Sequence, residues 1–224
     1  MECMICFQDL TASANWGSFF TKVEEKRLCE DCFVKLDKLS GTRCMLCSRR
    51  TTEKICLDCK RWQKEGKADL TFNYSIFAYN NFMKEVVAKW KYRGDYQIAE
   101  AFAADFRHAF KKKFSFIKNP IVIPIPLSEE RIKERAFNQA KQLADFLPAR
   151  TIELLARKHG DKQSKKSKEE RMNTENPFLV KGPIQKPAIV VDDIYTTGRT
   201  MYHAAERLKQ QGCPAVYGLT LIRG

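Results

Sequence analysis

The sequence lacks the features of a membrane-spanning or secreted protein. No run of 18 or more apolar residues occurs in the 224-residue chain, so we expect no transmembrane helix. The first ten residues, MECMICFQDL, contain no basic segment followed by an apolar stretch, which argues against a signal peptide. We therefore expect a cytoplasmic protein, and a hydrophobic content of 44% is sufficient for a globular core.

Two common nucleotide-binding motifs are also absent. The chain has no G-x-x-x-x-G-K-[ST] sequence, which a P-loop requires to hold the phosphates of a nucleoside triphosphate. It also has no G-x-G-x-x-G sequence, the signature of dinucleotide-binding folds. Any phosphate site in this protein must therefore be built in another way.

Acidic residues are scarce in the second part of the chain. Residues 1–60 contain 10 Lys and Arg against 9 Asp and Glu, whereas residues 61–224 contain 30 against 18. Most of the net charge of +13 therefore lies beyond residue 60. Such a positive field attracts polyanions, which include nucleic acid and phosphate-rich metabolites, although a basic surface without a specific partner is the simpler alternative.

Cysteine, in contrast, is abundant and paired. Eight of the nine cysteines form four C-x-x-C pairs: Cys3/Cys6, Cys29/Cys32, Cys44/Cys47 and Cys56/Cys59. A C-x-x-C turn directs two thiolates at one centre, so two pairs complete a tetrahedral zinc shell. The sequence predicts two structural zinc ions, with sequential pairing as the simplest arrangement and interleaved pairing as the alternative. The ninth cysteine, Cys213, is expected to be buried.

Other uses of these cysteines are less consistent with the sequence. Disulfides require an oxidising compartment, and the absence of a signal peptide argues against one. A redox C-x-x-C motif occurs once in a protein rather than four times in succession. We predict a zinc module over residues 1–62 and a second domain over 68–224. Zinc thiolates make the module mildly acidic, which favours a folding or docking role over DNA binding.

The second domain reads as alternating strands and helices. A strand pair or hairpin is expected over 71–80, and helices are expected at 81–92, 96–114 and 137–147. Further strands are expected at 120–126, 151–158, 177–180, 188–193 and 215–223, with a helix at 199–212. This alternation predicts an α/β fold with a mainly parallel sheet flanked by helices.

The stretch AIVVDDIYTTGRT (188–200) carries the clearest chemical pattern. A buried strand ends in Asp192 and Asp193, and Thr196, Thr197 and Gly198 follow before a helix begins. Backbone N–H groups at a helix N-terminus form an anion cradle, to which threonine hydroxyls donate. The carboxylates repel an anion, so they must face hydroxyls or a metal on another part of the ligand.

This stretch resembles the phosphoribosyl-diphosphate signature of type I phosphoribosyltransferases. The resemblance implies that Asp192 and Asp193 contact the ribose hydroxyls and act in catalysis if the protein is an enzyme. It implies that the 5′-phosphate lies in a loop of Thr196, Thr197, Gly198, Arg199 and Thr200. Mg²⁺ would accompany the diphosphate and ribose.

Over nearly its whole length the chain is similar to the ComF family of bacterial DNA-uptake (competence) proteins. The matching segments are the C-x-x-C pairs, KYRGD (91–95), VIPIPLSEERIKERAFNQA (122–140), KQSKKSKEERMNTENPF (162–178) and the stretch above. On this resemblance Arg135, Asn138 and Gln139 are candidates for the diphosphate site, and Lys89, Lys91 and Arg93 are further anion contacts. Ala136 stands where relatives usually have glycine, and the basic stretch 157–171 lies where type I enzymes have a closing loop.

Two functions follow from this resemblance. The first is a competence protein that binds phosphoribosyl diphosphate, associates with other competence proteins and has affinity for single-stranded DNA. Trp62, Trp90, Tyr92 and Tyr96 lie near lysines and suit base stacking, although aromatic residues more often belong to a core. The alternative is an active phosphoribosyltransferase with an unknown acceptor.

Overall fold

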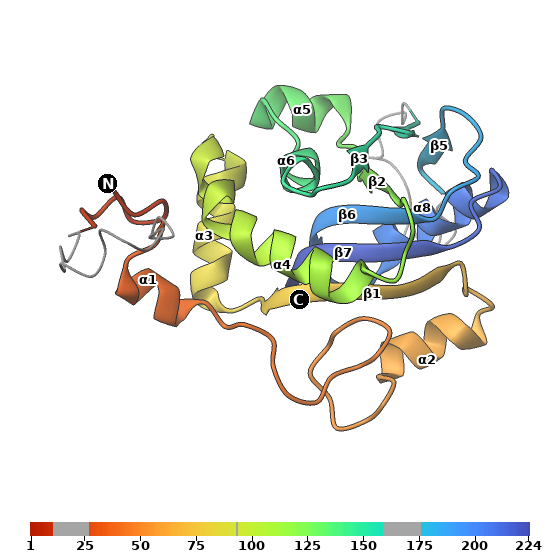
Figure 1. Cartoon of the computed structure of the whole chain (residues 1–224), viewed down its shortest axis with the longest axis horizontal. Helices are drawn as coiled ribbons and strands as arrows, with labels where there is room; N and C mark the ends of the chain where they lie inside the picture. The colour runs from red at the N-terminus through yellow and green to blue at the C-terminus, as the bar shows by residue number, and fades with distance from the viewer. Residues whose placement is uncertain (11–26, 93, 159–175) are drawn as a thin grey trace, which may run out of the picture.

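The computed structural model describes residues 1–10, 27–92, 94–158 and 176–224, and a parallel sheet forms its centre (Figure 1). Its five strands follow the order β1-β7-β6-β2-β3, and every neighbouring pair is parallel. The strands are β1 (Leu70–Ala78), β2 (Ile121–Pro124), β3 (Arg150–Thr151), β6 (Ala188–Tyr195) and β7 (Val216–Arg223). The predicted α/β class is therefore confirmed.

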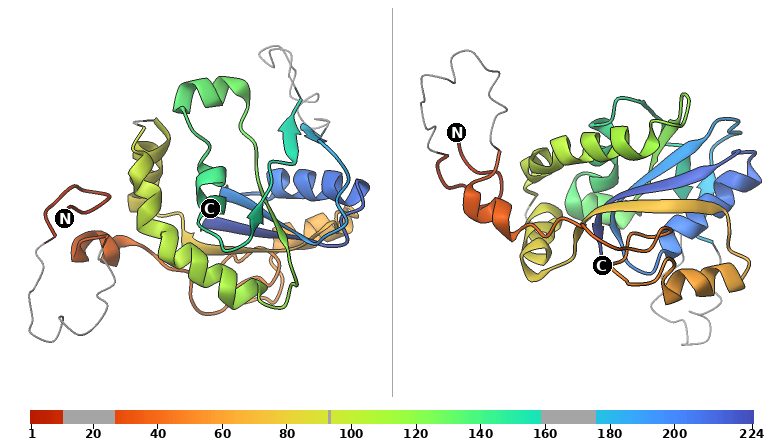
Figure 2. Two further views of the ribbon diagram at one scale, coloured as in Figure 1. Left: turned by 45° about the horizontal axis from the view of Figure 1, so that its top comes forward. Right: turned by 60° about the horizontal axis from the view of Figure 1, so that its bottom comes forward.

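Helices cover both faces of this sheet (Figure 2). One core is formed with α3 (Asn81–Tyr92), the 3-10 helix η2 (Tyr96–Phe102), α4 (Ala103–Phe114) and α6 (Gln139–Asp145). The other is formed with α8 (Arg199–Gln210) and the cysteines that precede and begin α2 (Leu57–Lys64). Successive residues of β6 alternate between the two, since Ile189 and Val191 enter the first core and Val190 enters the second.

The cysteine-rich region lies against the sheet. After α1 (Glu30–Lys35) the chain runs along β1, where the Leu39 N–H donates to the Ile76 carbonyl at 2.8 Å. The Asn73 N–H of β1 then donates to the Leu46 carbonyl at 2.8 Å. These contacts occupy the free edge of the sheet, which would otherwise expose unpaired backbone groups. The division of the chain into domains at residues 62 and 68 stays a prediction.

Three local expectations were wrong. Residues 71–80 form no hairpin: residues 71–78 belong to one strand, β1, which is a parallel partner of β7. The single strand expected over 151–158 is divided into β3 and β4 (Leu155–Arg157), and β4 pairs antiparallel with β5 (Phe178–Val180). The first part of the 96–114 helix is the 3-10 helix η2, although its expected apolar face is buried as predicted.

A helix not expected from the sequence, α5 (Glu129–Arg135), follows β2. The Ser128 hydroxyl caps its N-terminus, and Ala136 ends it in the left-handed region at φ +65°. Glycine adopts this conformation without a steric penalty, whereas alanine pays about 1 kcal/mol. The alanine that departs from the ComF pattern therefore stands at a position whose backbone favours glycine.

No helix within the described ranges 1–10, 27–92, 94–158 and 176–224 is long and apolar enough to cross a membrane.

Candidate functional site

Two adjacent carboxylates lie near the carboxyl end of the central strand β6. Asp192 and Asp193 are both largely but not fully buried, and the Asp193 N–H donates to Asp192 Oδ1 at 2.9 Å. Lys91, near the end of α3, forms an ion pair with Asp193 Oδ2, and these two side chains are only 14% and 13% exposed. The predicted acid pair thus exists, with one cation of the chain already beside it.

The protonation state of this pair depends on its surroundings. Burial raises the pKa of Asp192 well above its ordinary value, and the neighbouring charge of Asp193 raises it further, while Lys91 opposes the shift. A carboxyl in such a place favours a bound cation or a hydroxyl donor, since either compensates for the lost hydration. Both kinds of partner occur together in a sugar chelated to a divalent cation.

The segment predicted to bind phosphate, Thr196–Thr200 (the phosphate loop), leads from the end of β6 into the first turn of α8. Gly198 precedes the helix at φ +87°, and a Cβ at this position would lie 2.2 Å from the Tyr195 hydroxyl oxygen. Only glycine satisfies both conditions, because other residues disfavour this backbone and would clash with the tyrosine. The backbone of the loop therefore lies at the N-terminus of the twelve-residue helix α8, where free N–H groups and the helix dipole favour an anion.

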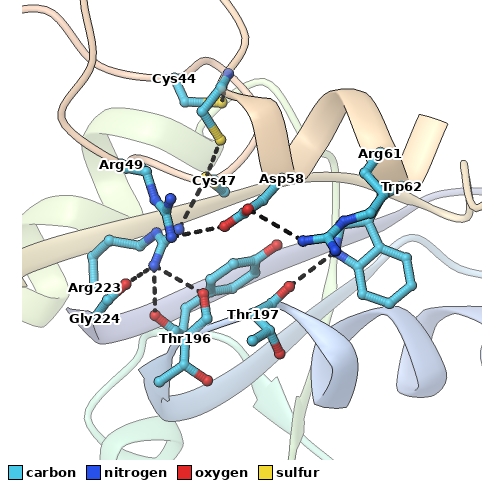
Figure 3. A network of polar contacts seen from close by, with 12 residues as sticks. Cys44, Cys47, Arg49, Asp58, Arg61, Trp62, Thr196, Thr197, Arg223 and Gly224 are labelled. Atoms are coloured by element: carbon cyan, nitrogen blue, oxygen red, sulfur yellow. Dashed lines mark hydrogen bonds and ion pairs between the residues drawn. The ribbon is translucent and has the colours of Figure 1, made fainter. Parts of the chain in front are cut away.

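Two residues outside the motif, neither of them predicted in this role, hold this loop in place (Figure 3). Arg223, in the last strand, donates to the carbonyls of Tyr195 at 3.2 Å and Thr196 at 2.9 Å. Trp62 Nε1 donates to the carbonyl of Thr197 at 2.8 Å. Separations of 27 and 135 residues leave no local pattern that would reveal such contacts.

Arg135 and Gln139 lie together on α5 and α6. Both are buried, and Arg135 Nη1 donates to Gln139 Oε1 at 3.3 Å. Arg135 Nε and Gln139 Nε2 have no hydrogen-bond acceptor among the described residues. Tyr92 lies next to Lys91 in the chain, and its ring is 5.4 Å from the Arg135 guanidinium. Two buried donors without acceptors suit an anion.

Other predicted residues are engaged elsewhere or lie outside the description. Asn138 caps α6, accepting from the Ala140 N–H at 2.9 Å and donating to the Ile125 carbonyl at 2.9 Å. Lys89 donates to the Ile5 carbonyl, in the first cysteine turn, at 3.2 Å. Arg93 lies outside the described residues, as does 159–175, which contains most of the predicted basic loop.

The eight paired cysteines form two clusters, in the sequential arrangement. The first cluster contains Cys3, Cys6, Cys29 and Cys32; the second cluster contains Cys44, Cys47, Cys56 and Cys59. Within each, all sulfur atoms lie within 4.8 Å of one another. The Cys6–Cys29 and Cys47–Cys56 sulfur separations are both 3.6 Å. Tetrahedral zinc with bonds of about 2.3 Å requires sulfur separations of about 3.8 Å, so both clusters fit the ion.

The electrostatics of the second cluster favour a thiolate. A hydrogen bond from Cys59 lowers the pKa of Cys47 to about 4 against the opposing effect of burial, and Arg223 adds to the lowering. Arg223 Nη2 lies 3.5 Å from Cys47 Sγ. Cys213, the unpaired cysteine, is buried as expected.

Of the four aromatic residues considered for base stacking, two are exposed. Tyr92 is 65% exposed and Tyr96 is 55% exposed. Trp90 is fully buried in the core, where Nε1 donates to Gln142, so stacking on this residue is excluded. Trp62 is occupied by the phosphate loop and by the Tyr202 ring, which is 4.6 Å from its own ring.

Comparison with known proteins assigns a class to this fold and site. Residues 93–223 match the profile of the phosphoribosyl transferase domain, so a phosphoribosyltransferase-like fold carries the carboxylates and the loop. The chain is 37% identical to competence protein ComFC of Bacillus subtilis (strain 168), covering 99% of this chain and 94% of that protein. It is 30% identical to competence protein ComFC of Streptococcus pneumoniae (strain ATCC BAA-255 / R6), covering both in full. The chain therefore belongs to the ComFC family of competence proteins.

Solved structures add little to this assignment. The match to a hypoxanthine phosphoribosyltransferase from Staphylococcus aureus covers 54% of this chain and 64% of that enzyme's chain, with 14% sequence identity and a TM-score of 0.31.

Proposed function

We propose that this protein binds phosphoribosyl diphosphate with Mg²⁺ at the carboxyl end of β6 and acts in the uptake of DNA during bacterial transformation. One observation supports the ligand above all: two carboxylates and a phosphate loop lie within the nine residues 192–200, on one strand, the turn that follows it and the start of α8. A single ligand that carries vicinal hydroxyls and a phosphate matches both. The DNA-uptake role is inferred from the competence proteins to which the chain is similar.

Each part of the ligand has proposed partners. Asp192 and Asp193 take the ribose hydroxyls and the cation, since ionised carboxylates accept hydrogen bonds and bind Mg²⁺. The phosphate loop takes the 5′-phosphate. Arg135 and Gln139 take the diphosphate, and Lys91 exchanges its carboxylate partner for the same anion. The two clusters each hold a structural zinc ion, and the protein acts in the cytoplasm with other competence proteins.

Calorimetry with phosphoribosyl diphosphate and Mg²⁺ tests the ligand. Wild type should bind, and the double variant Asp192→Ala/Asp193→Ala should bind at least about 100-fold more weakly, because two charge-assisted contacts are lost. Asp145→Ala, an exposed acid paired with Lys141 on α6, is the matched control and should bind like wild type. Absence of binding by wild type would remove the proposed ligand.

Affinity for single-stranded DNA is the second part of the proposal. The excess of basic residues beyond residue 60 and the exposed rings of Tyr92 and Tyr96 support it. Fluorescence anisotropy with labelled oligo-dT should show affinity that falls steeply with salt. Tyr92→Ala/Tyr96→Ala should weaken binding, whereas Phe116→Ala, at another exposed ring, should not. Binding that is independent of salt would contradict this mechanism.

Phosphoribosyl transfer is the alternative function. The match over residues 93–223 favours it, since the domain of that family provides the carboxylates and the loop in one unit. If transfer occurs, Asp192 and Asp193 stabilise the positive charge that develops on the ribose as diphosphate departs. Release of diphosphate in the presence of candidate bases distinguishes an enzyme from a protein that only binds the ligand.

A further inference from the structure

Arg223 connects the second cluster to the phosphate loop. This arginine is only 5% exposed, and its ring neighbour is Tyr195, at 5.0 Å. One terminal nitrogen donates to the carbonyls of Tyr195 and Thr196, and the other lies 3.5 Å from Cys47 Sγ (Figure 3). The same guanidinium therefore contacts a cysteine of the cluster and the backbone that leads into the loop.

Trp62 provides a second connection. It lies three residues after Cys59 on α2, so its position depends on the same cysteine turn. Nε1 donates to the Thr197 carbonyl at 2.8 Å, and the indole stacks on Tyr202 of α8 with an angle of 26° between the rings. Trp62 therefore contacts both the loop, at Thr197, and the first turn of α8, at Tyr202.

These contacts fix the direction of the loop's N–H groups. In a planar trans peptide the carbonyl of one residue and the N–H of the next point in opposite directions. Arg223 holds the Thr196 carbonyl and Trp62 holds the Thr197 carbonyl. The N–H groups of Thr197 and Gly198 must consequently point away from the cluster. An anion cradle requires such an orientation.

The same geometry makes the loop sensitive to the metal. Zn²⁺ holds the four cysteines of the second cluster together, so its loss releases both Cys47, which Arg223 contacts, and the cysteine turn from which α2 carries Trp62. Arg223 and Trp62 then lose the fixed base from which they hold the loop carbonyls. The first cluster contacts other elements: Lys89 on α3 donates to the Ile5 carbonyl, and Arg27, two residues before Cys29, pairs with Glu100 of η2. None of these residues belongs to the phosphate loop.

We propose that the second cluster sets the conformation of the phosphate loop, with Arg223 and Trp62 as positioning residues, so that affinity for a sugar 5-phosphate depends on metal at this cluster and not at the first. The identity of the ligand rests on the proposed function above, whereas the coupling between cluster and loop does not.

Hydrogen exchange measured by mass spectrometry tests the coupling without any ligand. Cys59→Ser removes one ligand of the second cluster, and Cys6→Ser removes one ligand of the first; elemental analysis should show the loss of one zinc ion from each. Exchange in peptides that cover 196–202 should accelerate at least about tenfold in Cys59→Ser because carbonyl anchors are lost, and it should not change in Cys6→Ser. Equal exchange in both variants would overturn the proposal.

A milder variant covers the case in which Cys59→Ser fails to fold. Trp62→Phe keeps an aromatic ring on Tyr202 and removes only the donor to Thr197. Affinity for ribose 5-phosphate should fall about 3- to 10-fold, the effect of one hydrogen bond, while affinity for Mg²⁺–pyrophosphate should stay unchanged. A merely structural defect would lower both affinities. Arg61→Gln, on the neighbouring exposed side chain, is the control and should alter neither.

The outcomes separate the two proposals. If wild type binds neither ribose 5-phosphate nor phosphoribosyl diphosphate, the proposed function fails, and the exchange experiment still decides the coupling. If wild type binds both and Trp62→Phe binds ribose 5-phosphate as well as wild type does, the role of Trp62 is overturned and the function stands.

Discussion

The two cysteine clusters share one spacing of ligands but differ in how the fold uses them. In the first cluster Cys6 is exposed and Cys29 is half-buried, whereas all four cysteines of the second cluster are buried. The first cluster joins the core formed by α3 and α4, and the second joins the core under α8. Figure 2 shows the two parts of the cysteine-rich region at separate places around the sheet.

This difference teaches that a zinc motif does not by itself reveal its role. The second cluster lies behind the phosphate loop and contacts it through Arg223 and Trp62. The first cluster lies beside α3, the helix that presents Lys91 to Asp193. The second cluster thus contacts the phosphate loop, and the first cluster contacts the helix that carries Lys91. Loss of one cluster should therefore affect the candidate site differently from loss of the other.

The largest effect is expected from metal removal. A chelator should release zinc in two phases, and the slower phase should be at least about tenfold slower, because buried thiolates are accessible only after local opening. Release from the second cluster should coincide with loss of tertiary structure, since a metal-dependent segment unfolds when the ion departs. Zinc release followed with a colorimetric chelator, alongside near-UV circular dichroism, measures both.

The double variant Cys6→Ser/Cys29→Ser provides the control, as it should lack the fast phase and keep the slow one. A single phase for both ions would show that the difference in burial has no consequence for stability.

The second prediction compares two glycines with the same backbone conformation. Gly198 has φ +87° and Gly41, in the segment between the clusters, has φ +71°. Gly198→Ala should lower the free energy of unfolding by about 2–4 kcal/mol, since it adds a clash with Tyr195 to the conformational penalty. Gly41→Ala meets open space and should cost only about 1 kcal/mol. Urea unfolding measures both, and equal losses would contradict the tight packing of the loop.

The sequence predicted the sheet and the chemical motif well, because both depend on local patterns. The apolar run of β6 followed by Asp192 and Asp193 places carboxylates at a strand end in any parallel sheet. It also predicted the two sets of four cysteines, since each ligand pair is separated by two residues.

It did not predict contacts between distant parts of the chain. Nothing near Arg223 or Trp62 indicates a partner in the loop, and the Lys91–Asp193 pair depends on how α3 packs. The hairpin expected over 71–80 was wrong because the aromatic-rich pattern of β1 does not specify a parallel neighbour 146 residues away, at Val216.

The third prediction concerns Asp192, which lies next to the Lys91–Asp193 pair and four residues before the phosphate loop. Burial, and secondly Asp193, raise its pKa in the folded state above the unfolded value. The folded state therefore favours the protonated carboxyl, so the contribution of Asp192 to stability is fully present below about pH 4 and is lost as the pH rises through the folded pKa. Asp192→Asn removes the titrating carboxyl and with it this loss of stability. Its melting temperature at pH 7.5 should equal or exceed that of wild type, and the advantage should disappear below pH 4.

Ligand binding should change in the opposite direction. An amide cannot provide the negative charge that a chelated sugar requires, so affinity for phosphoribosyl diphosphate with Mg²⁺ should fall at least about tenfold. Scanning calorimetry at several pH values and titration at one pH are sufficient. An advantage of Asp192→Asn over wild type that is as large at pH 4 as at pH 7.5 would show that the titration of Asp192 does not cause it.

The smallest effect is expected at the first cluster's contact with α3. Lys89→Met keeps the aliphatic stem and removes the donor to the Ile5 carbonyl, which should lower the free energy of unfolding by about 1 kcal/mol. Because this ammonium contacts the first cysteine turn and not the phosphate loop, affinity for ribose 5-phosphate should stay within twofold of wild type. Calorimetry measures the affinity and urea unfolding the stability. A larger loss of affinity with unchanged stability would instead place Lys89 among the ligand contacts, as the family resemblance implies, and would give the first cluster a direct part in binding.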